Sequence, residues 1–80
     1  PSPFVRNLAD RVTIGGIPYG ASVEIYTLTG ERVIRFTDVR AGGVQWDARN
    51  LAGSLVGSGV YIFTVEQDGR RVTGKLAVVR

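Results

Sequence analysis

Hydrophobic residues recur at every second position over several short stretches of the chain. Val12 and Ile14 alternate with polar neighbours, and Val23 and Ile25 stand on either side of Glu24. This alternation is typical of a β-strand that has one face in the core and one face in water. No window repeats apolar residues at the i, i+3, i+4 and i+7 spacing of a helix. The pattern therefore predicts an all-β chain.

The segment 60–65 is the most strand-like, because all six of its residues are β-branched or aromatic. Both of its alternate sets of side chains are largely apolar, which predicts a central strand covered on both faces. Asp68-Gly69 follows, and this pair predicts a two-residue hairpin turn because it tolerates positive φ. We expect a returning strand over 71–79, so that the C-terminal part forms one long antiparallel hairpin.

Four earlier strands are expected at 11–15, 22–26, 32–37 and 44–47. Within 32–37, Val33 falls on one face and Ile34 and Phe36 on the other, which predicts a bulge or a change of sheet. Val44 and Trp46 are expected to point inward. Breaker-rich loops and turns are expected at 15–20, 27–31, 41–43 and 48–54.

The segments that flank these strands have less regular patterns. The prolines of Pro1-Ser2-Pro3 predict an extended lead-in. Phe4 is expected to anchor this lead-in to the core, and residues 6–10 are expected to form a short turn. Leu55 and Val56 are expected to close the bottom of the core before the final hairpin.

Short strands separated by Gly, Asp and Asn turns predict an all-β, immunoglobulin-like (fibronectin III-like) antiparallel β-sandwich of about seven strands. The length of 80 residues corresponds to a single domain, 1–80. Because the chain begins at Pro1 and contains no methionine, we expect it to be a fragment of a longer protein.

Ten basic and seven acidic residues give a net charge of +3, and they are scattered along the chain. No basic cluster is interleaved with exposed aromatic residues, so nucleic-acid binding is not expected. Apolar runs stop far short of the ~20 residues that a membrane-spanning helix needs. No apolar signal segment is present either, so membrane insertion is not expected.

Histidine and cysteine are both absent, which removes the usual general base, the commonest metal ligand and the strongest neutral nucleophile. The serines have no evident base partner. Lys75 is the single lysine, and a solvated strand lysine is the favoured interpretation over a desolvated catalytic amine. We therefore expect no enzyme, no catalytic residue, no cofactor and no metal site.

Two other segments resemble ligand sites, one for calcium and one for phosphate, but turn formation is the favoured explanation of both. Asp47 with Asn50 offers oxygen ligands for calcium, but an Asp47 side chain that stabilises the turn through its own backbone is favoured. The glycines at 53, 57 and 59 open a strand instead of a helix and lack a following Lys-Ser/Thr. Turn formation explains them better than phosphate binding does.

Aromatic side chains offer a candidate sugar-stacking platform formed by Trp46, Tyr19, Tyr26 and Tyr61. Trp46 alternates with Val44, so its burial in the core is favoured. Tyr19 lies in a loop beside a proline and is the best candidate for an exposed ring. Carbohydrate binding stays open as an alternative.

The order and spacing of several motifs resemble a known family. The motifs are Pro3-Phe4, residues 23–33, Gly43-Val44-Gln45-Trp46-Asp47, Gly53, residues 58–63 and residues 74–80. Together they resemble the immunoglobulin-like domain of the flagellar hook-capping protein family. They also resemble related C-terminal domains of secreted bacterial enzymes, including type A sorting domains of type IX secretion. Two departures are Ser2, where asparagine is commonest, and Ala48, where glycine usually follows Trp-Asp.

The resemblance implies a non-catalytic C-terminal domain of an exported bacterial protein, secreted or at the cell surface, that acts in sorting or surface attachment. Its partner would be a protein, either the secretion machinery or a neighbouring domain of the parent chain. Recognition is expected to use the terminal strand, by strand addition at a sheet edge. The candidate partner-binding residues are Val72, Lys75, Val79 and Arg80. The alternatives are a structural spacer or assembly module of the hook-cap type, or a carbohydrate-binding accessory domain.

Overall fold

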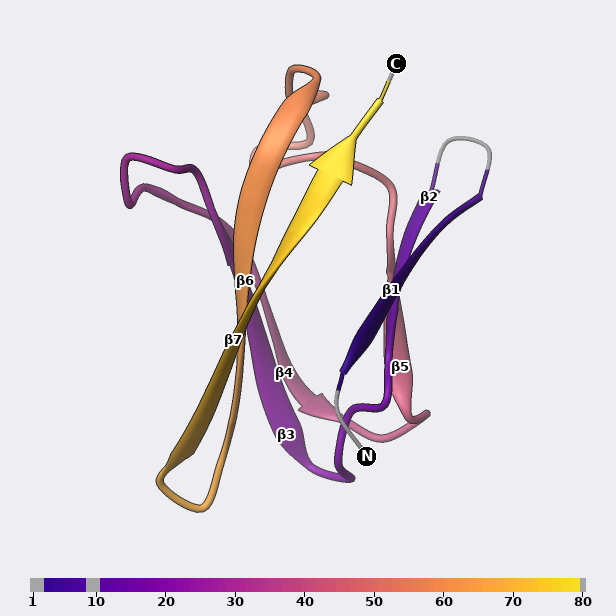
Figure 1. Cartoon of the computed structure of the whole chain (residues 1–80), viewed down its shortest axis with the longest axis vertical. Helices are drawn as coiled ribbons and strands as arrows, with labels where there is room; N and C mark the ends of the chain where they lie inside the picture. The colour runs from indigo at the N-terminus through magenta and orange to yellow at the C-terminus, as the bar shows by residue number, and fades with distance from the viewer. Residues whose placement is uncertain (1–2, 9–10, 80) are drawn as a thin grey trace.

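Antiparallel strands in two layers make up the computed structural model, which describes residues 3–8 and 11–79 (Figure 1). One sheet has three strands in the order β1-β2-β5, and the other has four in the order β4-β3-β6-β7. This arrangement confirms the predicted immunoglobulin-like β-sandwich of about seven strands. The strands are β1 (Phe4–Leu8), β2 (Arg11–Gly15), β3 (Ala21–Tyr26), β4 (Arg32–Val39), β5 (Gly43–Trp46), β6 (Gly59–Gln67) and β7 (Arg70–Val78).

The alternating apolar residues meet between the two sheets. Ile14 of β2 and Val23 and Ile25 of β3 have no exposed surface. Trp46 of β5 is 1% exposed, which confirms its predicted burial. Its indole Nε1 donates a hydrogen bond to the Arg49 carbonyl at 2.8 Å, so the one polar group of this large side chain is satisfied inside the core.

The predicted C-terminal hairpin is confirmed. β6 and β7 pair along their whole lengths with no register shift. The turn between them consists of Asp68 and Gly69, whose φ values are 52° and 78°. Two successive positive φ values are the signature of a type I′ turn, which suits the twist of a hairpin.

β6 is central, because it pairs with β3 on one side and β7 on the other. The prediction that both of its faces are covered is wrong. Phe63 and Val65 are buried, but Val60, on the opposite face, is 45% exposed. The β1-β2-β5 sheet lies over one face only, so an apolar residue on the other face of β6 remains open to solvent.

The predicted irregularity of the fourth strand is a pair of bulges. β4 shifts register against β3 near Ala21 and again near Tyr26. Val33 is the extra residue at the second shift and is buried at 8% exposure. At the first shift Asp38 adopts a φ of 53°, a value that few residues other than glycine adopt.

The N-terminal segment differs from the prediction. The turn expected at 6–10 is replaced by β1, which continues to Leu8; residues 9–10 lie outside the described residues, as do Pro1 and Ser2 of the lead-in. Phe4 is 54% exposed instead of anchored in the core. Its ring covers Gly15, its partner in β2.

The segment that precedes the last hairpin differs in part from the prediction. Val56 packs against the core as expected, but Leu55 is 51% exposed and forms an isolated bridge with Arg49. The turn between β5 and Leu55 is built on Asn50, whose Oδ1 accepts a hydrogen bond from the Ser54 N–H at 3.0 Å. The predicted turn at 48–54 is therefore confirmed.

Candidate functional site

β7 has a free edge. It is the last strand of its sheet and pairs, among the described residues, with β6 alone. In a two-residue hairpin the residues that flank the turn are hydrogen-bonded to each other, so Arg70 and every second residue after it bond to β6. The alternate residues, Arg71, Thr73 and Lys75, therefore direct their backbone N–H and C=O groups away from the sheet.

A side-chain contact supports this assignment. Asn7 of β1 donates a hydrogen bond from Nδ2 to the carbonyl oxygen of Ala77, 2.7 Å away. Ala77 has the same parity as Thr73 and Lys75, so its carbonyl points toward the free edge. Asn7 thus covers one end of the edge and links the two sheets.

The side chains of these edge residues point to solvent. Their neighbours Leu76 and Val78 face the core and are each 3% exposed. Since side chains alternate along a strand, Arg71, Thr73 and Lys75 lie on the outer face, and all three are exposed. The residues that offer free backbone groups are therefore the same residues that present two cationic side chains.

The predicted partner contacts that the structure describes do not all lie on one face of β7. Lys75 is exposed on the outer face of β7. Val72 lies on the inner face, beyond the cover of the other sheet, and is 48% exposed. Val79 follows the end of the strand and is 78% exposed, whereas Arg80 lies outside the described residues. The inner and outer faces of one strand separate Val72 from Lys75.

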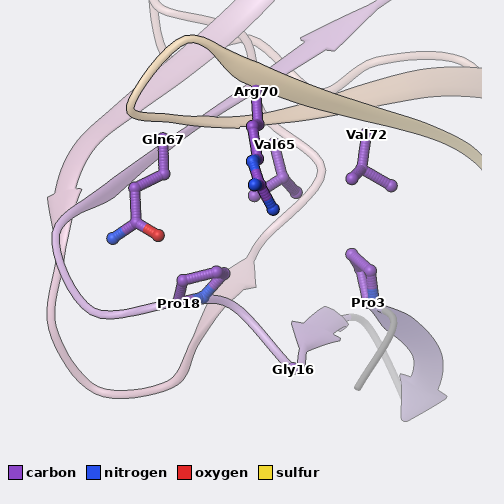
Figure 2. A pocket seen from close by; sticks show the side chains of 7 residues that line it. All are labelled: Pro3, Gly16, Pro18, Val65, Gln67, Arg70 and Val72. Atoms are coloured by element: carbon purple, nitrogen blue, oxygen red, sulfur yellow. The ribbon is translucent and has the colours of Figure 1, made fainter.

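A pocket lies beside Val72 at the hairpin end of the sandwich. Its volume is about 200 Å³. Figure 2 shows the Arg70 side chain reaching from the hairpin toward the centre of the residues that line this pocket. The lining residues are Pro3, Gly16, Pro18, Val65, Gln67, Arg70 and Val72.

Hydrogen bonds hold the two walls of this pocket together. Gln67 Nε2, from the end of β6, donates to the carbonyl of Tyr19 in the loop between β2 and β3. The same loop is tied to the rest of the fold by the Ile17 N–H, which donates to Gly42 at 3.0 Å. The pocket is therefore built from a fixed loop and a regular hairpin.

The charges around β7 are only partly compensated. Arg71 lies 3.4 Å from Glu66 in an exposed pair. Neither the Arg70 side chain nor the Lys75 side chain has a hydrogen bond or an ion pair with any residue in the part of the chain that the structure describes. Two cations therefore remain available beside the free edge.

Arg70 and the prolines of the pocket were not identified from the sequence. The Asp-Gly turn places Arg70 at the start of a strand, but no local signal shows that this strand faces Pro18 and Pro3. That approach depends on contacts between residues far apart in the chain. Sequence spacing alone gave no means of predicting it.

The other candidate ligand groups have structural partners. Asp47 Oδ2 lies 3.8 Å from Arg49 Nε, and Asn50 stabilises the turn described above. Within residues 3–8 and 11–79, no group of three or more acidic side chains is placed to hold a metal ion. No helix in this part of the chain is long and apolar enough to span a membrane.

The aromatic residues do not gather on one surface. Trp46 is buried, and Tyr61 packs edge-on against it with ring centroids 5.8 Å apart. Tyr19 is 68% exposed, as predicted. The Arg40 guanidinium lies 5.6 Å from the centroid of the Tyr19 ring, so one face of that ring already has a cation–π partner.

The chain is similar to part of PorZ, an essential bacterial surface component of the type-IX secretion system of human oral-microbiomic Porphyromonas gingivalis. The identity is 36% over 89% of this chain, and the TM-score is 0.76. The match covers 10% of the PorZ chain, so this chain spans about a tenth of that protein's length. No protein-family model and no curated protein matches the chain. The similarity shows that this chain shares its immunoglobulin-like fold with a segment of PorZ.

Proposed function

We propose that this chain is a non-catalytic module of an exported bacterial protein, secreted or held at the cell surface, and that the type IX secretion apparatus handles it as a sorting or attachment domain. The observation that carries the proposal is the 36% identity to a segment of PorZ over 89% of the chain. The sequence resemblance to sorting domains points in the same direction. Neither the similarity to PorZ nor the sequence resemblance requires a catalytic site in this chain.

The geometry of the last strand suggests how such a module is recognised. The free edge of β7 presents backbone groups in a regular row, and a partner strand that adds to such an edge gains main-chain hydrogen bonds. Among the expected contact residues that the structure describes, Lys75 has outward backbone groups on this edge together with an exposed, outward side chain.

A fusion experiment tests the proposal. The 80 residues are placed after a signal peptide and a fluorescent reporter in a bacterium that carries a type IX secretion system. The reporter should reach the cell surface or the medium, and it should stay in the periplasm in a strain that lacks the system. Equal retention of the fusion and of the reporter alone would contradict the proposal.

A second candidate function is a structural spacer or assembly module. The observation that favours it is that the similar segment of PorZ makes up only 10% of that chain, so such a domain occurs inside a much longer protein. This function predicts that the module packs on its neighbours. Sedimentation of the parent protein with and without residues 1–80 would show a change in shape or association, whereas the sorting function predicts none.

A further inference from the structure

Every second residue along the β7 edge presents the same set of groups to a partner. Arg71, Thr73 and Lys75 each offer a free N–H and C=O and an outward side chain. A strand that pairs with them places its own outward side chains directly opposite, at distances where opposite charges attract and like charges repel. Carboxylates on the partner are therefore favoured opposite Lys75, and also opposite Arg71, which lies 3.4 Å from Glu66 of β6.

The inner side of the same edge has a different chemistry. The partner residues that lie between the hydrogen-bonded positions point inward, toward Val72 and the pocket lined by Pro3 and Pro18. A volume of about 200 Å³ is below the roughly 300 Å³ at which pockets for drug-sized ligands begin. The pocket therefore suits a single apolar side chain.

Arg70 adds a charge at this pocket. Its guanidinium has no partner among the described residues and extends toward the centre of the lining residues (Figure 2). A carboxylate at the next inward position of the partner, two residues from the apolar side chain, would pair with it. Charge complementarity on both faces thus points to one kind of occupant.

We infer that the β7 edge binds an extended acidic segment of a partner protein by strand addition, in which carboxylate residues alternate with apolar residues and one apolar side chain enters the pocket beside Val72. The added strand pairs with Arg71, Thr73 and Lys75 and ends before Ala77, whose carbonyl accepts from Asn7. The inference deepens the proposed function; the assignment of this partner to the secretion apparatus rests on that function, but the strand addition does not.

A second copy of this chain is a poor occupant of the same edge. If two β7 strands paired, their arginine and lysine side chains would lie among like charges on the outer face, which is destabilising. A peptide with the sequence of β7 is therefore expected not to bind. Binding of that peptide as tightly as the acidic one would overturn the inference.

Peptide titration tests the inference on the folded chain. The probe is a short fluorescein-labelled peptide in which glutamate alternates with valine, with one leucine at its centre, and binding is followed by fluorescence anisotropy. The version with lysine in place of glutamate should bind at least about tenfold more weakly, because like charges then face each other. Replacement of the central leucine by serine should weaken binding by about threefold or more. Equal affinities for the three peptides would overturn the inference.

Protein variants locate the binding site. Lys75→Glu and Arg6→Glu each change the net charge by the same amount, but Arg6 is exposed on β1 of the other sheet. Lys75→Glu should weaken binding of the acidic peptide by about threefold or more, and Arg6→Glu should change it less. Thr73→Pro, which removes one outward N–H, should also weaken binding. Equal effects of Lys75→Glu and Arg6→Glu would show attraction by net charge alone and would contradict strand addition.

The outcomes for the two proposals are separable. Normal export of the reporter fusion together with no peptide binding would reject the acidic strand partner and leave the sorting function standing. Peptide binding together with a fusion that is never exported would reject the sorting function and leave the strand-addition site standing. The buried Trp46 gives a fluorescence check that each variant is folded.

Discussion

The two edges of the four-stranded sheet differ in almost every respect that controls strand pairing. β4 is interrupted by two register shifts, and the carbonyl of Val33 accepts a hydrogen bond from the Leu51 N–H at 3.2 Å. β7 pairs with β6 without any shift, and Asn7 covers only one end of it. Bulges and covering loops are the means by which natural sheets prevent further pairing. Further strand pairing is therefore hindered at the β4 edge and remains possible at the β7 edge.

The charges beside the two edges differ less sharply, because Arg71 on the β7 side also pairs with Glu66. On the β4 side, Arg32 pairs with Glu24 at 3.2 Å and Arg40 pairs with Asp38 at 2.7 Å. On the β7 side, Lys75 has no ion pair within the described part of the chain. Cationic side chains on an edge strand oppose pairing between identical strands but attract an acidic one. Lys75 thus opposes pairing between two β7 strands, and in the inferred complex it favours an acidic partner.

The strongest test of the β7 edge is a pair of proline substitutions at adjacent positions. The Val72 N–H bonds to β6, whereas the Thr73 N–H points outward. Val72→Pro should lower the free energy of unfolding by about 3 kcal/mol, because it removes a ladder hydrogen bond within the sheet. Thr73→Pro should cost about 1 kcal/mol, mainly through its restricted φ. Urea denaturation followed by Trp46 fluorescence measures both, and equal losses would contradict the assigned edge.

A second test concerns how β7 is fixed on its inner side. A Cβ added to Gly74 would lie 2.5 Å from Cζ of Phe63, its partner in β6, and that ring is buried. Gly74→Val should therefore destabilise the fold by about 2 kcal/mol through overpacking. The ring of Phe4 covers Gly15 in the same way, but it is half exposed and can move aside.

The matched variant Gly15→Val should accordingly cost less than Gly74→Val. Chemical denaturation of the two variants gives the comparison directly. A larger loss for Gly15→Val would mean that the exposed Phe4 ring is held more firmly than the buried one.

The sequence predicted those features of the sandwich that depend on neighbouring residues. Asp68-Gly69 predicted the hairpin because its turn chemistry is local, and the alternation around Glu24 predicted which side of β3 is buried. The open face of β6 was not predicted, since Val60 is as apolar as a core residue and only the placement of the other sheet exposes it. Arg70 was missed for the same reason. The terminal strand was identified, but which of its faces is buried and which of its backbone groups are free depend on the pairing register.

A third test addresses the charges on the β4 side. Burial raises the pKa of Glu24, but hydrogen bonds from Arg32 and Tyr26 and the charges of Arg35 and Arg32 outweigh it, so this pKa lies below its ordinary value of 4.5. A carboxyl group whose pKa is lower in the folded state stabilises the fold above its unfolded pKa and loses that contribution as the pH falls through its folded pKa.

Glu24→Gln should therefore cost at most about 1 kcal/mol at neutral pH, because the Arg32 side chain is 53% exposed. The difference from the parent protein should disappear as the pH falls below 4.5 and passes the lowered pKa. Glu31→Gln, in the exposed turn beside β4, is the control for loss of a negative charge. A cost of Glu24→Gln that stays constant from neutral to acid pH would show that the charge is not its cause.

The smallest expected effect compares the two aspartates that adopt positive φ, one beside each edge. Asp68 has a φ of 52° in the hairpin turn of β7, and Asp38 has a φ of 53° in the bulge of β4. Asparagine tolerates this conformation well and is favoured before glycine in type I′ turns, so Asp68→Asn should stabilise the fold by about 0.5 kcal/mol or less. Asp38→Asn gives up the pair with Arg40 and should show a smaller gain or none. Thermal unfolding of the two variants side by side distinguishes the positions, and a larger gain at Asp38 would mean that strain in the bulge outweighs its ion pair.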